Sequence, residues 1–139
     1  MEEIEELLRI WDQAGERPYE VLQELGVYDE FLQYLNESQV LPTQPIYRGT
    51  LRHQELQQDD LLEYTYPTSW SSSENIAKNF ISEMPDPVIL VFSANELVNG
   101  VYNTENTYDE REVILAPIIF TVIDRQDIDG YIYLHLEVV

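Results

Sequence analysis

The stretch EVILAPIIFTVI, residues 112–123, predicts β-strands on either side of Pro117. Residues 88–92 (VILVF) form a near-continuous apolar run that is typical of a buried strand. Residues 131–139 alternate, with apolar side chains on one face, which also indicates a strand. Residues 98–107 are mostly polar and predict a loop. The second half of the chain is therefore expected to be rich in β-strands.

The first third of the chain has helical spacing instead. Apolar residues repeat at helical intervals over residues 2–12, and the glutamates at the start suit the N-terminal end of a helix. Pro18 can occupy the first turn of a second helix, which stops at Gly26. Residues 28–36 predict a third helix. Together these segments predict a small helical layer.

The segments between these regions have mixed signals. Residues 44–50 and 65–70 indicate short strands, and residues 54–62 predict a helix or a turn. Ser71 and Glu74 have the spacing of a capping box, so a helix is expected to follow them. It would run to Pro85, because Pro85 and Pro87 close it.

The expected fold class is α+β, in one domain that spans residues 1–139. The helical layer takes residues 1–40, and a mixed or antiparallel β-sheet takes residues 44–139. A chain of 139 residues can form one compact core but not comfortably two. No apolar run has the length of a membrane-spanning helix, and the acidic N-terminus is unlike a signal peptide. We therefore expect a cytoplasmic protein, in the producing cell or in a host.

The chain is strongly acidic. It has 27 Asp and Glu against 7 Lys and Arg, and its formal net charge is −20. Direct binding to nucleic acid is not expected, because contacts with phosphates require clustered cationic side chains. An acidic surface attracts basic partners, but it also serves solubility, and both interpretations stay open here. The chain has no cysteine, so disulfides and thiolate metal sites are excluded.

Arg48 lies in an apolar strand and is followed by Gly49. A buried guanidinium is costly unless an anion accompanies it, and its planar fork suits two contacts to a phosphate. Gly49 would let a ligand approach the backbone closely. The alternative is that Arg48 forms a structural ion pair with one of the many carboxylates.

Two further segments carry candidate residues. Thr68 and Ser69 offer hydroxyl groups where a strand ends and a helix begins, although a turn and a helix cap could also account for them. Glu110 and Glu112 are expected on one face of a strand that continues into an apolar stretch. Such a pair can divide two tasks, with one carboxylate stabilising a developing cation and the other accepting a proton. The Glu-x-Glu spacing alone is weak evidence in so acidic a chain.

In this order, the three motifs resemble those of the Arg-Ser-Glu class of mono-ADP-ribosyltransferases. The likeness covers about residues 44–125. It includes Tyr-Arg-Gly at residues 47–49, the segment TSWSSSENIAKNF at residues 68–80 and EREVIL at residues 110–115. Pro67 stands where the family's second motif has its first serine. The short chain is consistent with a minimal enzyme of this family, bacterial or phage, or with a degenerate member.

The resemblance implies NAD⁺ as the substrate, without a metal. Arg48 would hold the NAD⁺ phosphates, with Gly49 and Thr68 beside the ligand. Ser69 would position Glu112, which would bind the ribose and stabilise the cation formed as nicotinamide leaves. Glu110 would activate the acceptor, and a glutamate at its position implies arginine.

Other parts of the site are left more open. Tyr108 would contact the target protein, and an aromatic such as Phe80 or Tyr102 would line the nicotinamide pocket. His53 and His135 are expected to take no part. The predicted function is transfer of ADP-ribose to an arginine of a basic protein, with no membrane involved. The alternatives are NAD⁺ hydrolysis and a non-catalytic acidic protein that binds or inhibits a basic partner.

Overall fold

The computed structural model describes residues 2–14, 18–93, 96–104 and 112–139. Its helices are α1 (Glu2–Gln13), α2 (Pro18–Glu24), α3 (Tyr28–Asn36) and α4 (Glu74–Asn79). Its strands are β1 (Gln39–Val40), β2 (Ile46–Thr50), β3 (Leu61–Tyr64), β4 (Thr68–Ser71), β5 (Val88–Phe92), β6 (Val98–Tyr102), β7 (Glu112–Leu115), β8 (Ile118–Ile128) and β9 (Tyr131–Val138). The predicted α+β class is confirmed. Among the described helices, none could cross a membrane.

The strands of the described residues form one nine-stranded sheet in the order β1-β6-β7-β4-β2-β5-β9-β8-β3. Only β5 and β9 pair in parallel among these neighbours, so the sheet is mixed, as expected. The join between β2 and β4 is short, because Tyr47 and Ser71 are the one residue pair in its register. The sheet thus has two well-paired halves, β1-β6-β7-β4 and β2-β5-β9-β8-β3, which are joined by a single residue pair.

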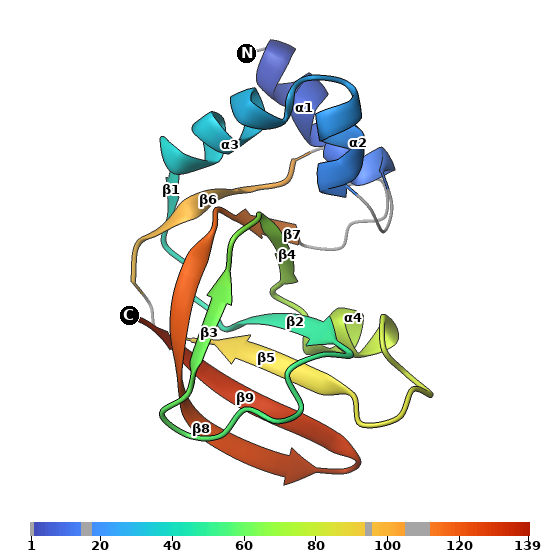
Figure 1. Ribbon diagram of the computed structural model, residues 1–139, viewed down its shortest axis with the longest axis vertical. Helices are drawn as coiled ribbons and strands as arrows, with labels where there is room; N and C mark the ends of the chain where they lie inside the picture. Colours follow the sequence, from blue (N-terminus) through green and yellow to red (C-terminus); the bar gives the residue numbers. More distant parts are fainter. Residues whose placement is uncertain (1, 15–17, 94–95, 105–111) are drawn as a thin grey trace.

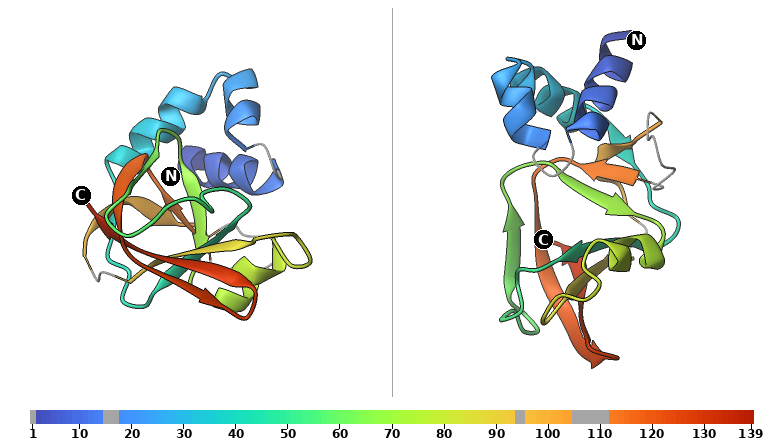
Figure 2. Two further views of the ribbon diagram at one scale, coloured as in Figure 1. Left: turned by 60° about the horizontal axis from the view of Figure 1, so that its bottom comes forward. Right: turned by 90° about the vertical axis from the view of Figure 1, so that its right-hand side faces the viewer.

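Helices cover the two halves separately (Figures 1 and 2). Helices α1, α2 and α3 lie together at one end of the molecule, and their apolar residues Trp11, Leu22 and Phe31 pack with Val101 of β6 and Ile114 of β7. Helix α4 lies beside β2 near the other half. The main core lies on the other side of the sheet, where apolar residues of both halves pack together.

The main core contains alternate residues of several strands. In β7, Val113 and Leu115 belong to this core, whereas Ile114 faces the helical layer. Because strand side chains alternate between the two faces, Glu112 lies on the same face as Ile114. Strand β5 is buried along its whole length because α4 covers its outer face, through Ile89. That double burial explains the continuous apolar run in the sequence.

Two predicted segments differ from the structure. Residues 98–107 were expected to be a loop, but Val98–Tyr102 form β6 and pair with β7. Gly100 serves close strand approach rather than a turn, since a Cβ there would lie 2.5 Å from the carbonyl oxygen of Ile114. The second difference is in residues 54–62, which contain turns and the start of β3 but no helix.

The predicted capping box is also displaced. Ser73, not Ser71, is the N-cap of α4, and its hydroxyl accepts a hydrogen bond from the backbone N–H of Ile76. Ser71 is instead the last residue of β4, and its hydroxyl accepts from the N–H of Ser73. The strand extends further than the sequence pattern indicated, so the helix starts later. Both serines still satisfy backbone donors at the strand–helix junction.

Gly49 brings β2 close to α4. A Cβ at this position would lie 2.3 Å from the carbonyl oxygen of Ala77. We therefore expect Gly49→Ala to lower the free energy of unfolding by about 1–3 kcal/mol, because backbone would have to shift. Gly26→Asn is the matched control: it has φ of +73° and open space around it, and asparagine tolerates this conformation. Urea unfolding of both variants checks this, and an unaffected Gly49→Ala would contradict the packing argument.

Candidate active site

A cavity of about 960 Å³ lies between the helical layer and the sheet. Trp11 of α1 and Tyr19 of α2 line its helical side, and Arg48, Ser69 and Glu112 line its sheet side. Three candidate residues from separate predicted motifs therefore reach one space. Within the described ranges, no set of His, Asp and Glu side chains is arranged to hold a metal ion.

Glu112 is the most deeply placed acid of the cavity. The residue is only 7% exposed. The hydroxyl of Ser69 donates a hydrogen bond to Oε2, and so does Nε1 of Trp11, at 3.0 Å. Nδ2 of Asn103 donates to Oε1 at 2.6 Å. These donors offset the cost of burying a carboxylate and hold it in one orientation.

Sequence reasoning did not find Trp11 or Asn103 as partners of Glu112. Trp11 is one of the apolar residues that repeat at helical intervals over residues 2–12, and Asn103 lies in the segment predicted to be a loop. One signal was available for Trp11, because a buried indole N–H generally requires an acceptor. Nothing in the local sequence identified that acceptor, which lies 101 residues away.

The alternation of β4 assigns different tasks to its two hydroxyl residues. Ser69 faces Glu112, whereas Thr68 faces the main core, where its Oγ1 accepts a hydrogen bond of 2.7 Å from Nε1 of Trp70. Trp70 packs on Phe120 in that core, with ring centroids 5.6 Å apart. Thr68 is among the residues that line the cavity, but its hydroxyl is occupied by the hydrogen bond from Trp70.

Arg48 reaches into the cavity from β2. Its NH1 donates to the carbonyl oxygen of Ser69 at 3.0 Å, and its guanidinium lies over the ring of Tyr64, 5.5 Å from the centroid. Its Nε is buried and has no hydrogen-bond partner. No carboxylate of the described residues forms an ion pair with Arg48. The alternative of a structural ion pair therefore finds no support in this part of the chain.

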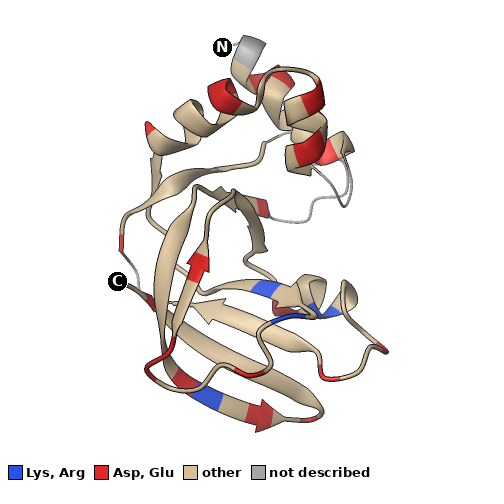
Figure 3. Cartoon of the chain, in the orientation of Figure 1, with Lys and Arg blue, Asp and Glu red and all other residues tan. Residues whose placement is uncertain are grey.

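Other basic groups lie beside Arg48. Arg52 and His53 line the same cavity as Arg48, in a chain of net charge −20. Figure 3 shows basic positions on β2 and on the segment that follows it. Burial lowers the pKa of His53 below its ordinary value. The positive charges of Arg48 and Arg52 lower this pKa further, whereas the carboxylate of Glu55 opposes them. His53 was expected to take no part, yet its ring nitrogen Nε2 is 3.2 Å from the hydroxyl of Tyr64.

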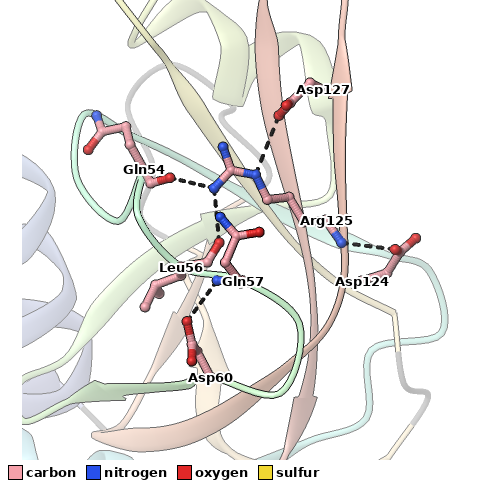
Figure 4. A network of polar contacts seen from close by, with 7 residues as sticks. All are labelled: Gln54, Leu56, Gln57, Asp60, Asp124, Arg125 and Asp127. Atoms are coloured by element: carbon pink, nitrogen blue, oxygen red, sulfur yellow. Dashed lines mark hydrogen bonds and ion pairs between the residues drawn. The ribbon is translucent and has the colours of Figure 1, made fainter.

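A network around Arg125 anchors the segment that carries Arg52 and His53 (Figure 4). NH1 of Arg125 donates to the carbonyl oxygens of Gln54 and Leu56, and its Nε pairs with Asp127 at 3.5 Å. The connection between β2 and β3 is thereby tied to β8. Arg125, which does not line the cavity, thus stabilises the segment that contributes Arg52 and His53 to its lining.

The remaining predicted residues are placed as follows. Gly49 lines the cavity, but the room left by its missing side chain is taken by α4 rather than kept for a ligand. Phe80 lines the cavity and is 66% exposed. Tyr102 is exposed on β6 and does not line the cavity. Tyr108 and Glu110 lie outside the described residues.

Comparison with solved structures identifies the fold. The chain superposes on the ADP-ribosyltransferase Vis from Vibrio splendidus, in a complex with agmatine, with a TM-score of 0.64 and 22% identity over 99% of this chain and 67% of that one. It superposes on C3stau2 from S. aureus, solved with NAD, with a TM-score of 0.72 and 11% identity, covering 100% of this chain and 87% of that one. The chain has the ADP-ribosyltransferase fold.

The same fold is found over nearly the whole length of a third neighbour. The ATR domain of SpvB from Salmonella matches with a TM-score of 0.63 and 11% identity, over 99% of this chain and 98% of that domain. No protein-family model and no curated protein matches the sequence. The resemblance indicated by the three motifs is therefore confirmed for the fold.

Proposed function

We propose that the chain is a mono-ADP-ribosyltransferase that transfers ADP-ribose from NAD⁺ to an arginine of a protein and releases nicotinamide. The observation that carries this proposal is the buried Glu112 carboxylate, held by Ser69 in one cavity with Arg48. We treat residues 1–139 as one such domain, with residues 44–139 as the NAD⁺-binding core.

The charges of the cavity suit the two ends of NAD⁺. The anionic diphosphate would meet Arg48 and Arg52 on the β2 side, where a guanidinium can donate two hydrogen bonds to phosphate oxygens. The cationic nicotinamide ribose would lie toward Glu112. Ser69 would contact this ribose while holding the carboxylate, and Gly49 and Thr68 would form the adjoining wall.

The reaction would proceed by departure of nicotinamide. The glycosidic C–N bond breaks, its electron pair leaves with nicotinamide, and positive charge develops on the ribose. Glu112 would stabilise that charge because it is already oriented and poorly hydrated. A guanidine nitrogen of the target then bonds to the ribose carbon, and Glu110 takes the proton that this nitrogen loses.

The choice of arginine rests on Glu110 and on the neighbour Vis, whose structure holds agmatine, a small guanidine. Tyr108 would contact the target protein. The net charge of −20 supports a basic target, because complementary charge raises the rate of encounter. With water as the acceptor, the same site would instead hydrolyse NAD⁺.

Nicotinamide release from NAD⁺ by the purified protein tests the proposal, measured alone, with agmatine and with a mixture of basic proteins. We expect release in each case and ADP-ribosylated agmatine in the second. Release without any transfer would indicate an NAD⁺ hydrolase. No release and no binding of NAD⁺ would favour the non-catalytic binding protein.

The position of His53 predicts a pH dependence of NAD⁺ binding. Its pKa is lowered in the free protein by burial and by Arg48 and Arg52, so His53 is neutral near pH 7. A bound diphosphate would stabilise the protonated ring and raise this pKa. Affinity for NAD⁺ should therefore increase by about three- to tenfold as the pH falls from 7.5 to 5.5.

Calorimetry in buffers of different ionisation enthalpy measures the proton uptake that accompanies this binding. His53→Gln should abolish the uptake and flatten the pH profile. The folding stability of the free protein should change in the opposite direction to its NAD⁺ affinity. Because the pKa of His53 is lower in the folded than in the unfolded state, stability should decrease as the pH falls through 6.5 toward the folded-state value. Proton uptake that persists in His53→Gln would show that another group is responsible.

A further inference from the structure

The Glu112 carboxylate is held from two directions by residues that no motif contains. The indole N–H of Trp11 comes from the helical layer and binds Oε2. The amide of Asn103, which follows β6, binds Oε1. The two oxygens are thus fixed by different elements, in addition to the hydroxyl of Ser69 on Oε2.

We propose that Trp11 and Asn103 are positioning residues for Glu112, so that the helical layer is part of the active site. The proposal rests on the proposed function. A glutamate side chain has three rotatable bonds, and its terminal torsion is broad unless hydrogen bonds restrain it. Indole and amide donors restrain it without adding positive charge, which preserves the negative charge that faces the developing cation.

Trp11 is itself well fixed. It is 4% exposed, and its ring stacks on Phe31 of α3 with centroids 5.2 Å apart. The direction of its N–H is therefore set by the packing of α1 against α3. Separation of α1 from α3 would therefore carry the donor away from Glu112.

Asn103 is fixed to Glu112 a second way. Its backbone N–H donates to the backbone carbonyl of Glu112 at 3.0 Å, where β6 and β7 run side by side. The main-chain bond sets the amide beside the carboxylate, and the residue is 8% exposed. An asparagine at this point thus extends the β6–β7 pairing into a side-chain contact.

Trp11→Phe tests the role of the indole because phenylalanine keeps an aromatic ring at this buried position and removes the N–H, together with part of the ring system. We expect kcat for nicotinamide release to fall by about 10- to 100-fold, the range for loss of one hydrogen bond to a charged group, while KM for NAD⁺ changes by less than about threefold. Asn103→Leu should act similarly. Since both residues act through one carboxylate, the double variant should lose less than the product of the two effects.

Leu35→Val is the matched control. Leu35 is fully buried in the same helical core, but its side chain has no hydrogen-bonding group, so its variant removes one methylene from the core without removing a donor to Glu112. Urea unfolding compares the stabilities, and kcat in the control should stay within about twofold of wild type. An equal fall of kcat in both variants would overturn the positioning role.

A spectroscopic readout separates the contact from the activity. The chain has two tryptophans, so ¹⁵N-labelled protein gives two indole N–H signals, assigned with Trp11→Phe. Glu112→Gln should shift the Trp11 signal far more than the Trp70 signal, and an unmoved Trp11 signal would overturn the proposal.

A wild type that releases no nicotinamide would overturn the proposed function and the positioning role with it. An active wild type with unchanged kcat in Trp11→Phe would overturn the positioning role alone.

Discussion

Glu112→Gln is expected to lower kcat for nicotinamide release by at least about a hundredfold, the loss seen when one preorganised electrostatic contact is removed from a transition state. Glutamine has nearly the same shape but no negative charge to stabilise the ribosyl cation. Its NH₂ group would also face at least one of the donors that now bind the carboxylate, among them Trp11 and Asn103. Some loss of stability should therefore accompany the loss of rate, and urea unfolding measures it separately.

Two other carboxylates provide the contrast for this experiment. Glu137→Gln changes an exposed residue of β9 and should leave release unaffected. Glu110→Gln should abolish transfer to agmatine while part of the NAD⁺ hydrolysis survives, because in the proposed reaction only the acceptor step would need that carboxylate. A Glu112→Gln protein that is folded and keeps most of its release would contradict the role of Glu112.

Arg48→Met is expected to raise the dissociation constant of NAD⁺ by roughly 10- to 100-fold, because each charge-assisted hydrogen bond contributes about 1.5–3 kcal/mol. Methionine keeps much of the apolar stem but removes the guanidinium that reaches the cavity. Arg48→Lys should have an intermediate effect, since an ammonium retains the charge but not the planar fork. Titration calorimetry with NAD⁺ measures all three proteins.

Arg9, an arginine that does not line the cavity, controls for the change in net charge. Arg9 lies on α1 in an exposed pair with Glu5, at 3.6 Å, and Arg9→Met should bind NAD⁺ as the wild type does. The Arg48 variant also loses the bond to the Ser69 carbonyl, so its unfolding must be compared with that of the wild type. Equal affinity in Arg48→Met and wild type would remove Arg48 from the phosphate site.

The parts of the fold that were predictable carry local signals. Helix α3 was predicted with its observed bounds because its apolar residues repeat at helical spacing, and β5 because burial on both faces makes every residue apolar. Strand β6 was missed because its Asn99-Gly100 pair is typical of turns. Gly100 is in fact required because β7 approaches its backbone closely. Such a contact between two strands cannot be predicted from the sequence of either strand alone.

The same distinction applies to the site. Arg48, Ser69 and Glu112 could be proposed from the sequence because each lies in a recognisable local setting, and the structure places them in one cavity. Trp11 and Asn103 could not, because their role exists only where α1 and β6 meet β7. An indole on an amphipathic helix looks the same in sequence whether it fills the core or holds an acid.

The single residue pair between β2 and β4 has a mechanical consequence. A sheet bends or parts most easily along the line with the fewest hydrogen bonds. Here that line runs beside the cavity, and NH1 of Arg48 crosses it to reach the carbonyl of Ser69. Spreading of the sheet would therefore cost least at this line, where each half could keep its own helices and strand pairing. If NAD⁺ binds as proposed, entry of the bulky dinucleotide would require deformation of this one join, and neither packed half would have to unfold.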